Sequence, residues 1–502
     1  MEGMNNIKLF ILLLVLSFFW GCEYDFPKEK LPSETELGAV NTEKVVVIGD
    51  GWIAGVMDGA LYQSGQKNSL GALIAERMNA VAGKEFNQAI VDSENGYNFY
   101  ESDNHNIYGK WAYQFTNREQ ENPNRKLTSG TKPGVFQGDK TTLCDLSVPG
   151  LKTTQVEDAE LTENPWFERI STSAKSTYLD EISKTNPSFA VMWLGMTDVM
   201  GFAANGAINQ TGGQENYLTH FGPLPTVAQF RSGLDKLINE LLQNTECKIV
   251  VGNLISIKNL PYFNMRKYNS LFLENAKLGL AMGHYRKFND AVQEWNRSVP
   301  PEQQRPFIGF FDNGYYPHEQ SFVAIDSSLS DAYYPDGSPL EKIRKLQPDE
   351  MVLYNFTEEM IEEGYGSVVP LSENNYLTAS HAKMIEERIT AFNAVISEIK
   401  AENAGKIAVA DINSLAGKVA ETSETDAAGD LLTSKIIYFN GVPVEGLLGM
   451  NSIYSLDVLH YNQRGNAYVA NEFLRTLNRE FNAKISTIDI NLYVGNTFSV
   501  TY

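Results

Sequence analysis

The sequence predicts an α/β fold in which helices cover both faces of a mainly parallel sheet, giving a three-layer α/β/α sandwich. Apolar runs with the length and composition of buried strands begin at Val45 and occupy 189–194, 249–255 and 407–412. Helical patterns lie between these runs, and strands that alternate with helices are typical of parallel sheets buried on both faces. A weaker apolar run at 485–493 also has strand character.

Two of the intervening segments place their apolar residues on one helical face. These residues are Phe230, Leu234, Leu237, Leu241 and Leu242 in the first segment, and Ile385, Ile389, Phe392, Ile396 and Ile399 in the second. The second segment has near-heptad spacing, but the repeat is too short for a coiled coil. We therefore expect both helices to pack on the core.

The N-terminal 21 residues are predicted to be a signal peptide. The stretch 7–20 is almost entirely apolar, too short for a comfortable membrane span, and Lys8 lies near its start. The run ends in Gly21 and Cys22, and a small residue before a cysteine resembles a bacterial lipobox. An ordinary signal peptide with an incidental cysteine is the alternative. We favour lipidation at Cys22, because no Ala-x-Ala cleavage site follows.

A lipidated Cys22 would attach the mature chain to a membrane. Glu23 and Asp25 follow at once, similar to the acidic export tag of Bacteroidota surface lipoproteins. The stretch 22–42 is rich in Pro, Lys and Glu and is predicted to be a tether. We expect an outer-membrane lipoprotein, at the cell surface or on the periplasmic face.

The composition narrows the classes of partner. The formal net charge of −21 argues against nucleic acid as a partner, because phosphate binding needs clustered Lys and Arg.

Cys144 and Cys247 are too few for a disulfide framework and are predicted to be buried, with one disulfide as the alternative. The histidines lack metal-ligand spacing, so we expect no zinc site and no cofactor.

Two stretches interrupt the alternation within a domain expected at 43–485. The first, 98–142, is polar, and the second, 258–371, is rich in aromatic residues. The aromatic residues are Tyr262, Phe263, Phe310, Phe311, Tyr315, Tyr316, Tyr333 and Tyr334. We expect them to build the core of a subdomain, with sugar stacking or protein docking as the alternative. The tail 486–502 is predicted to be a strand at the sheet edge.

The first apolar strand runs into a Gly-rich turn and then a helix. The segment 45–55 reads VVVIGDGWIAG. It resembles the first signature block of the GDSL/SGNH hydrolase superfamily, whose turn reads Gly-Asp-Ser and supplies the nucleophilic Ser. In this chain that position is Gly51, which has no side chain. The resemblance therefore implies a serine hydrolase fold without its nucleophile.

Three further blocks match this superfamily in the same order along the chain. They are LSVPG at 146–150, WLGMTD at 193–198 and DVLH at 457–460. The stretch 260–263 also resembles the segment after the fourth strand in Bacteroidota members of the superfamily. The resemblance implies a flavodoxin-like sheet, with the blocks at the carboxyl ends of its strands.

The resemblance also implies a role for each block. Gly150 supplies an oxyanion-hole N–H. Gly195 and Thr197 are the oxyanion-hole positions of the third block, where Thr197 replaces the Asn that normally donates a second hydrogen bond. His460 is the general base and Asp457 orients it, as acyl transfer requires. Loss of the nucleophile costs about a millionfold in turnover, and loss of one oxyanion donor costs roughly a hundred- to a thousandfold.

The departures at Gly51 and Thr197 favour a catalytically inactive or impaired protein. Both residues are small, so we expect them to leave a pocket. The chain would then be a binding or accessory subunit, acting through this pocket or the large insertion on a glycan ligand or on outer-membrane protein partners. The alternative is an active esterase on acylated glycans or lipids, which uses a water activated by His460. A substitute nucleophile at Ser64 or Ser69 is also possible, although serine at a helix start usually caps it.

Overall fold

The computed structural model describes most of the chain after the N-terminal region. The described residues are 36–79, 85–98, 106–114, 124–208, 222–312, 314, 316–421, 423–425, 431–434 and 437–497. The expected signal peptide, Cys22 and most of the expected tether lie outside these residues. Within the described part, no helix combines the length and apolar character that crossing a membrane requires.

The centre of the molecule is a parallel sheet in the order β1-β4-β5-β12. Its strands are β1 (Val45–Gly49), β4 (Phe189–Trp193), β5 (Lys248–Gly252) and β12 (Ile407–Ala410). Every residue of β1 and β4 is buried, as expected for strands covered on both faces. The four strand predictions in this sheet are confirmed.

A fifth segment runs beside the free edge of β1. The amide of Val47 donates to the carbonyl of Cys144 at 2.8 Å, and the amides of Leu146 and Val148 donate to Val47 and Gly49 at 2.9 and 2.8 Å. Counting this segment as the second strand gives the order 2-1-3-4-5. In doubly wound sheets of this order, ligands bind at the switch point beyond the first and third strands. Here that point lies beyond the carboxyl ends of β1 and β4.

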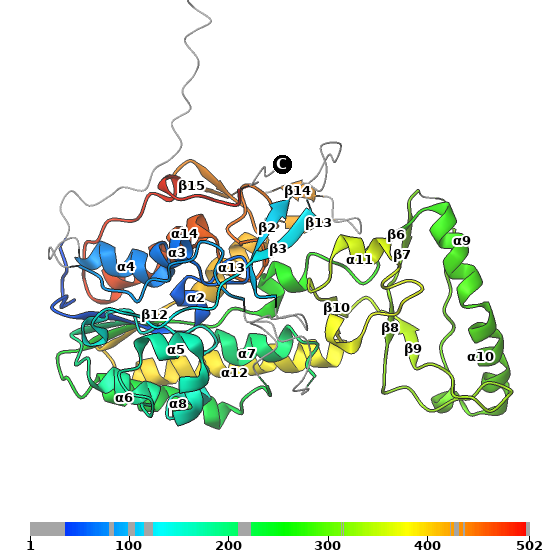
Figure 1. Cartoon of the computed structure of the whole chain (residues 1–502), viewed down its shortest axis with the longest axis horizontal. Helices are drawn as coiled ribbons and strands as arrows, with labels where there is room; N and C mark the ends of the chain where they lie inside the picture. Colours follow the sequence, from blue (N-terminus) through cyan, green and yellow to red (C-terminus); the bar gives the residue numbers. More distant parts are fainter. Residues whose placement is uncertain are drawn as a thin grey trace, which may run out of the picture.

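Helices form a layer on each face of the sheet (Figure 1). One layer contains α4 (Leu70–Asn79), α13 (Ile412–Ala420) and α14 (Gln463–Glu480), and the other contains α6 (Tyr178–Ser183), α8 (Val227–Leu241) and α12 (Ala379–Glu402). The expected apolar faces of α8 and α12 are buried, and their Phe230 and Phe392 rings stack 3.9 Å apart. The three-layer prediction is confirmed.

Shorter elements complete the sandwich. They are α2 (Gly51–Ala54), α3 (Gln63–Lys67), α5 (Pro165–Ile170), α7 (Met196–Ala203), β2 (Tyr108–Gln114) paired with β3 (Asn124–Ser129), β13 (Ser423–Thr425) paired with β14 (Leu431–Ser434), and β15 (Ile437–Phe439) paired with β16 (Val442–Val444). The β2–β3 hairpin belongs to the first expected insertion.

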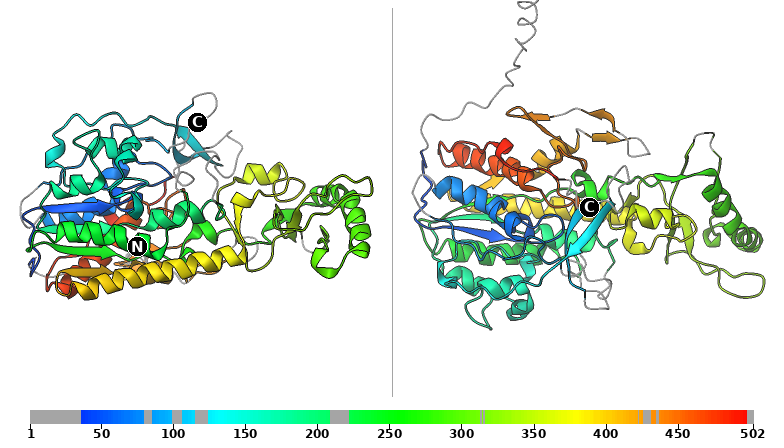
Figure 2. Two further views of the ribbon diagram at one scale, coloured as in Figure 1. Left: turned by 90° about the horizontal axis from the view of Figure 1, so that it is seen from below. Right: turned by 45° about the horizontal axis from the view of Figure 1, so that its top comes forward.

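A lobe with its own hydrophobic core projects from one end of the sandwich, and α12 runs along the sandwich toward it (Figures 1 and 2). Its elements are β6 (Leu271–Leu273), α9 (Asn275–His284), α10 (Arg286–Ser298), β7 (His318–Gln320), β8 (Val323–Ile325), β9 (Ile343–Lys345), β10 (Met351–Val352), α11 (Glu358–Glu362) and β11 (Tyr376–Leu377). The buried residues of this second core lie between Leu271 and Tyr376.

The aromatic residues of the second insertion divide into three groups. Phe310 is buried in the lobe and Tyr334 packs against its core, as expected for a subdomain core. Tyr262 and Phe263 belong instead to the main core. Phe311, Tyr316 and Tyr333 are exposed, and Tyr315 lies outside the described residues.

The predicted C-terminal strand is wrong for the described residues up to 497. The stretch from Ile485 is irregular and contains only a short 3-10 turn at Ile490–Leu492. Its backbone amide and carbonyl groups form hydrogen bonds with side chains rather than with a neighbouring strand. Asn471 bonds both the amide and the carbonyl of Ile488, Asn478 does the same for Ile485, and Arg77 donates to the carbonyls of the two residues between them.

The two cysteines in the folded domain are free thiols, so the disulfide alternative is wrong. Cys247 is buried as expected, and burial raises its pKa to about 12. Cys144 is only half-buried, because it lies in the irregular segment at the sheet edge beside β1.

Candidate functional site

The turn after β1 joins the first residues of two helices. Asp50 caps α2, with its Oδ1 atom accepting from the amide of Trp52 at 3.1 Å. Its Oδ2 atom accepts from the amide of Thr197, in the first turn of α7, at 2.8 Å. The backbone at Gly49 approaches β4 so closely that a Cβ atom there would lie 2.0 Å from the carbonyl oxygen of Trp193. This close approach brings Gly51 and Thr197 to the same edge of the sheet.

Asp50 is fully buried. Burial raises the pKa of Asp50 to about 6, while hydrogen bonds from Thr197 and Trp52 and the charge of His460 act in the opposite direction. In the folded protein this carboxyl group therefore holds its proton more tightly than an exposed Asp would. Its contacts tie it to the backbone of both helices, which explains why Asp is needed here whether or not any chemistry takes place.

Asp457 and His460 form a hydrogen-bonded pair, with 2.7 Å between Oδ2 of Asp457 and Nδ1 of His460. The Asp457 carboxylate also accepts from the amides of Leu459 and His460 at 2.9 and 2.8 Å, from the hydroxyl of Ser455 at 3.0 Å, and from the amide of Gly59 at 2.8 Å. Burial acts to raise the pKa of Asp457, but His460 and these donors together outweigh burial and lower this pKa overall. The carboxylate therefore organises a whole turn besides orienting His460.

The His460 ring is sealed beneath Trp52. The two ring centroids are 4.9 Å apart, and the exposed fractions of His460 and Trp52 are 1% and 3%. Trp52 also makes edge contacts with the Trp193 and Tyr461 rings at 5.7 and 5.8 Å. The expectation of an open pocket at this position is wrong, because the large side chain next to Gly51 packs over the histidine.

The remaining predicted site residues also lie at this edge. Gly195 precedes α7 with φ of 116°, and a Cβ atom there would meet the Phe230 ring at 2.7 Å. Gly150, with φ of 84°, follows the segment that pairs with β1. Thr197 is 4% exposed and holds Asp50 through its amide. The structure thus brings the residues of all four blocks together and buries Thr197 with the Asp–His pair.

The two serines considered as substitute nucleophiles, Ser64 and Ser69, form structural hydrogen bonds. Ser69 precedes α4 and its Oγ atom accepts from the amide of Ala72 at 3.1 Å, so it caps this helix as expected. Ser64 lies inside α3 and donates to a carboxylate oxygen of Glu94 at 2.7 Å. The prediction that Ser64 caps a helix is wrong.

A small polar cavity lies beside the turn that carries Asp457, and Leu456 of this turn contributes to its lining. It has a volume of about 200 Å³ and is lined by Met57, Asp58, Tyr62, Ser64, Lys110, Trp111, Ala112, Leu456, Asn462, Gln463 and residues 494–497. Asp58 accepts from the amide of Leu456 at 2.8 Å and from the hydroxyl of Tyr62 at 2.7 Å. No sequence pattern indicated Asp58, because its partner Leu456 lies 398 positions away along the chain.

Replacing Asp58 with asparagine should stabilise the protein at pH 7.5 by up to about 3 kcal/mol. Burial, and to a lesser extent the charge of Asp457, raises the pKa of Asp58 from 3.8 to about 6. The folded state therefore binds the proton more tightly than the unfolded chain does, and its stability falls as the pH rises from 3.8 to about 6. Asparagine stays neutral, can keep both hydrogen bonds and tolerates the positive φ of 55° at this position.

Urea unfolding of Asp58→Asn and the wild type at pH 4 and pH 7.5 measures this effect. The difference between the two proteins should be small at pH 4 and large at pH 7.5. An equal difference at both values would show that the ionised carboxylate is not the cause.

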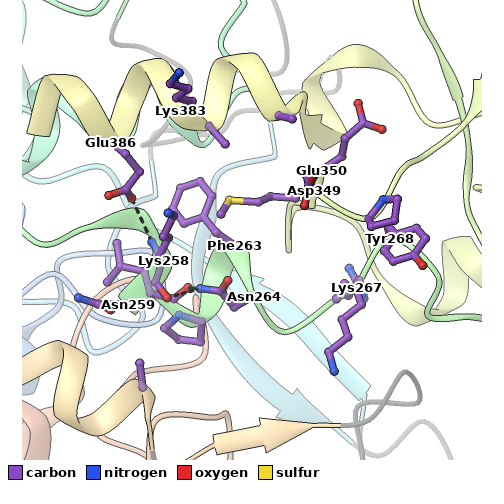
Figure 3. Close-up of a pocket in the computed structure, with 18 of the residues that line it drawn as sticks. Lys258, Asn259, Phe263, Asn264, Lys267, Tyr268, Asp349, Glu350, Lys383 and Glu386 are labelled. Atoms are coloured by element: carbon purple, nitrogen blue, oxygen red, sulfur yellow. Dashed lines mark hydrogen bonds between the residues drawn. The ribbon is translucent and has the colours of Figure 1, made fainter.

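An open cleft of about 1230 Å³ lies next to this edge, between the sandwich and the base of the lobe (Figure 3). Its apolar lining consists of Leu260, Pro261, Phe263, Met351, Ala379, Ala382, Ala420 and Leu447, and its charged lining of Lys258, Arg266, Lys267, Asp349, Glu350, Lys383, Glu386 and Glu387. The Phe263 ring projects between α12 and the segment that carries Lys258. Both signs of charge surround an apolar floor.

Gly51, Thr197 and His460 line neither the cleft nor the small polar cavity. Across the described parts of the chain, no group of three or more His, Cys, Asp or Glu side chains is placed to hold a metal ion. The blocks predicted from the sequence meet at the buried centre. No sequence pattern indicated that Trp52 closes this centre, although Trp52 directly follows Gly51.

Comparison of the sequence with known proteins gave no relatives: no family model matches the chain, and no curated protein matches it.

Proposed function

We propose that this protein is a lipid-anchored cell-envelope protein whose hydrolase-like centre is catalytically inactive and which acts as a binding or accessory subunit. The observation that carries the proposal is the sealed Asp457–His460 pair. The base is 1% exposed and lies against Trp52, the residue that follows the glycine where the resembled family has its serine. A substrate carbonyl would need to reach this histidine, and Trp52 occupies its approach.

The open cleft is the binding surface in this proposal. Ligand sites are typically concave and mostly apolar, with a few polar groups that fix orientation. The cleft has this character, because Phe263 and Met351 contribute to its floor and charged side chains surround it. Its volume of about 1230 Å³ exceeds the usual range for small-molecule sites. We infer that it takes a segment of a macromolecule, such as an outer-membrane partner.

Lys383 offers a way to test the cleft. Its side chain is 77% exposed on α12. Its Nζ atom lies 3.9 Å from Oε1 of Glu387, close to the upper distance limit for an ion pair. Lys383→Glu should therefore fold normally and change the charge of the cleft. Lys277→Glu is the matched control, because Lys277 is an exposed helical lysine on α9, away from the cleft.

The experiment is quantitative co-purification of the tagged full-length chain from detergent-solubilised membranes. A partner should be recovered at a fixed ratio with the wild type and with Lys277→Glu, and its yield should fall with Lys383→Glu. Recovery of the protein alone would count against an accessory subunit, and equal yields with both variants would count against the cleft.

Cys22→Ser should move the protein from the membrane fraction to the soluble fraction.

One observation favours the alternative, an esterase in which His460 activates a water. The 2.7 Å hydrogen bond from Nδ1 to Asp457 is the geometry that a general base requires. The same bond also serves the turn, whose amides converge on Asp457. A catalytic role predicts turnover that depends on His460, whereas a structural role predicts loss of stability without loss of turnover.

A further inference from the structure

Five planar side chains stack between the β2–β3 hairpin and the base of the lobe. The guanidinium of Arg125 lies 4.5 Å from the ring centroids of both Trp111 and Tyr354. The guanidinium of Arg266 lies 4.3 Å from the Tyr354 ring and 4.4 Å from the Phe356 ring. Cations over aromatic faces attract the ring, most strongly when desolvated. The stack therefore joins segments that are distant in sequence.

The hairpin end of the stack holds the turn that carries Asp457. Arg125 donates from Nη1 to the carbonyl of Leu456, the residue before Asp457, at 2.7 Å. The amide of Trp111 donates to the carbonyl of Asp58 at 2.8 Å, and Asp58 in turn accepts from the amide of Leu456. A shift of Arg125 would thus release the carbonyl on one side of Asp457.

A second connection reaches the other side of the same turn. The amide of Tyr354 donates to the carbonyl of Tyr262 at 3.0 Å, and the amide of Tyr262 donates to the carbonyl of Val458 at 3.1 Å. Both connections start at Tyr354. The carbonyls on the two sides of Asp457 are therefore held from one position at the base of the lobe.

The turn itself is held in an unfavourable backbone conformation. Val458 is fully buried and has φ of 53°. A positive φ is a genuine outlier for a β-branched residue, and such conformations persist only where the surroundings impose them. If the surrounding contacts weaken, this strain favours a change in the backbone of the turn, and the contacts of His460 would change with it.

The other end of the stack lies at the cleft. Arg266 lines the cleft, donates to the carbonyl of Phe356 at 2.5 Å and pairs with Glu358. A ligand that contacts Arg266, or that moves the segment around Met351, would act directly on the stack. A strained turn that depends on its surroundings is the kind of element through which a change at one site can reach another.

We propose that the cleft and the sealed Asp457–His460 turn are coupled through this stack, so that occupation of the cleft opens the turn. Arg125 and Tyr354 are the residues that position the turn. The proposal rests on the proposed function in one respect, that the cleft is the binding surface. The coupling between the stack and the turn can be tested without any ligand, so the two proposals fail separately.

The test is hydrogen–deuterium exchange of the folded protein, read on peptides that cover 455–462. The amides of Leu459 and His460 report on the turn, because both donate to Asp457. Tyr354→Ala removes the central ring and should speed their exchange by about tenfold or more, with little change in β4 and β5. Arg125→Lys, which keeps the charge but not the planar group, should act in the same direction.

Tyr334→Ala is the matched control. Like Tyr354, Tyr334 is a half-buried tyrosine near a cation, with the Lys287 ammonium 5.1 Å from its ring, but it packs against the lobe core outside the stack. It should leave exchange at 455–462 unchanged. Unchanged exchange in both Tyr354→Ala and Arg125→Lys, or equally fast exchange in Tyr334→Ala, would overturn the coupling. If Tyr354→Ala does not fold, Arg125→Lys alone decides.

Discussion

Replacing Asp457 with alanine should lower the free energy of unfolding by about 3–5 kcal/mol. The change leaves the buried amides of Leu459 and His460 and the half-buried amide of Gly59 without their acceptor, and each buried donor left unsatisfied costs about 1–3 kcal/mol. It also removes the partner of Nδ1 of His460. Urea unfolding followed by circular dichroism at pH 7.5 measures the loss.

Asp457→Asn is the informative companion to this variant. Asparagine keeps one acceptor oxygen in the turn, so the loss of stability should be clearly smaller than for alanine. If Asp457→Ala unfolds at the same urea concentration as the wild type, the carboxylate does not hold the turn. Its pairing with His460 would then need a catalytic explanation.

The second large effect is expected at Gly49, where alanine should destabilise the protein by about 3 kcal/mol or more. Gly49 has φ of 154°, and an added Cβ atom would lie 2.0 Å from the carbonyl oxygen of Trp193. Relief of this overlap requires β1 and β4 to separate where Asp50 joins α2 and α7. Thermal and urea unfolding would both show the loss.

Gly51→Ala is the matched control for Gly49→Ala. Gly51 is the first residue of α2 and is not among the positive-φ glycines, so its backbone does not require glycine. We expect a change within about 1 kcal/mol. A large loss at Gly51 would mean that close packing, rather than loss of a reactive group, accounts for glycine at this position.

The sheet was predictable because its strands are continuous apolar runs between amphipathic helices, and both patterns follow directly from burial. The same reasoning failed at 485–493, where the three isoleucines are buried but Asn471 and Asn478 take the backbone hydrogen bonds. Burial alone does not distinguish a strand from a segment whose backbone is satisfied by side chains.

For the candidate site, the sequence indicated which residues meet but not whether they are accessible. The blocks around Gly51, Thr197 and His460 could be placed at one sheet edge, because parallel strands end there together. The packing of Trp52 over His460 depends on side-chain directions, which no spacing rule predicts. The cleft combines segments near Lys258, Asp349, Lys383 and Gly446, which only the fold brings together.

The most direct test of an inactive centre is hydrolysis of p-nitrophenyl acetate by a soluble form beginning at Glu23, beside His460→Ala and Gly51→Ser. We expect the wild type and His460→Ala to show the same rate, about a millionfold below that of an intact triad enzyme. His460→Asn replaces His460→Ala if alanine unfolds the turn. Activity gained by Gly51→Ser would show that substrate reaches the centre despite Trp52, and that the missing serine alone disables it. Wild-type turnover that disappears in the His460 variant would contradict the account and establish an enzyme that works without a serine nucleophile at position 51.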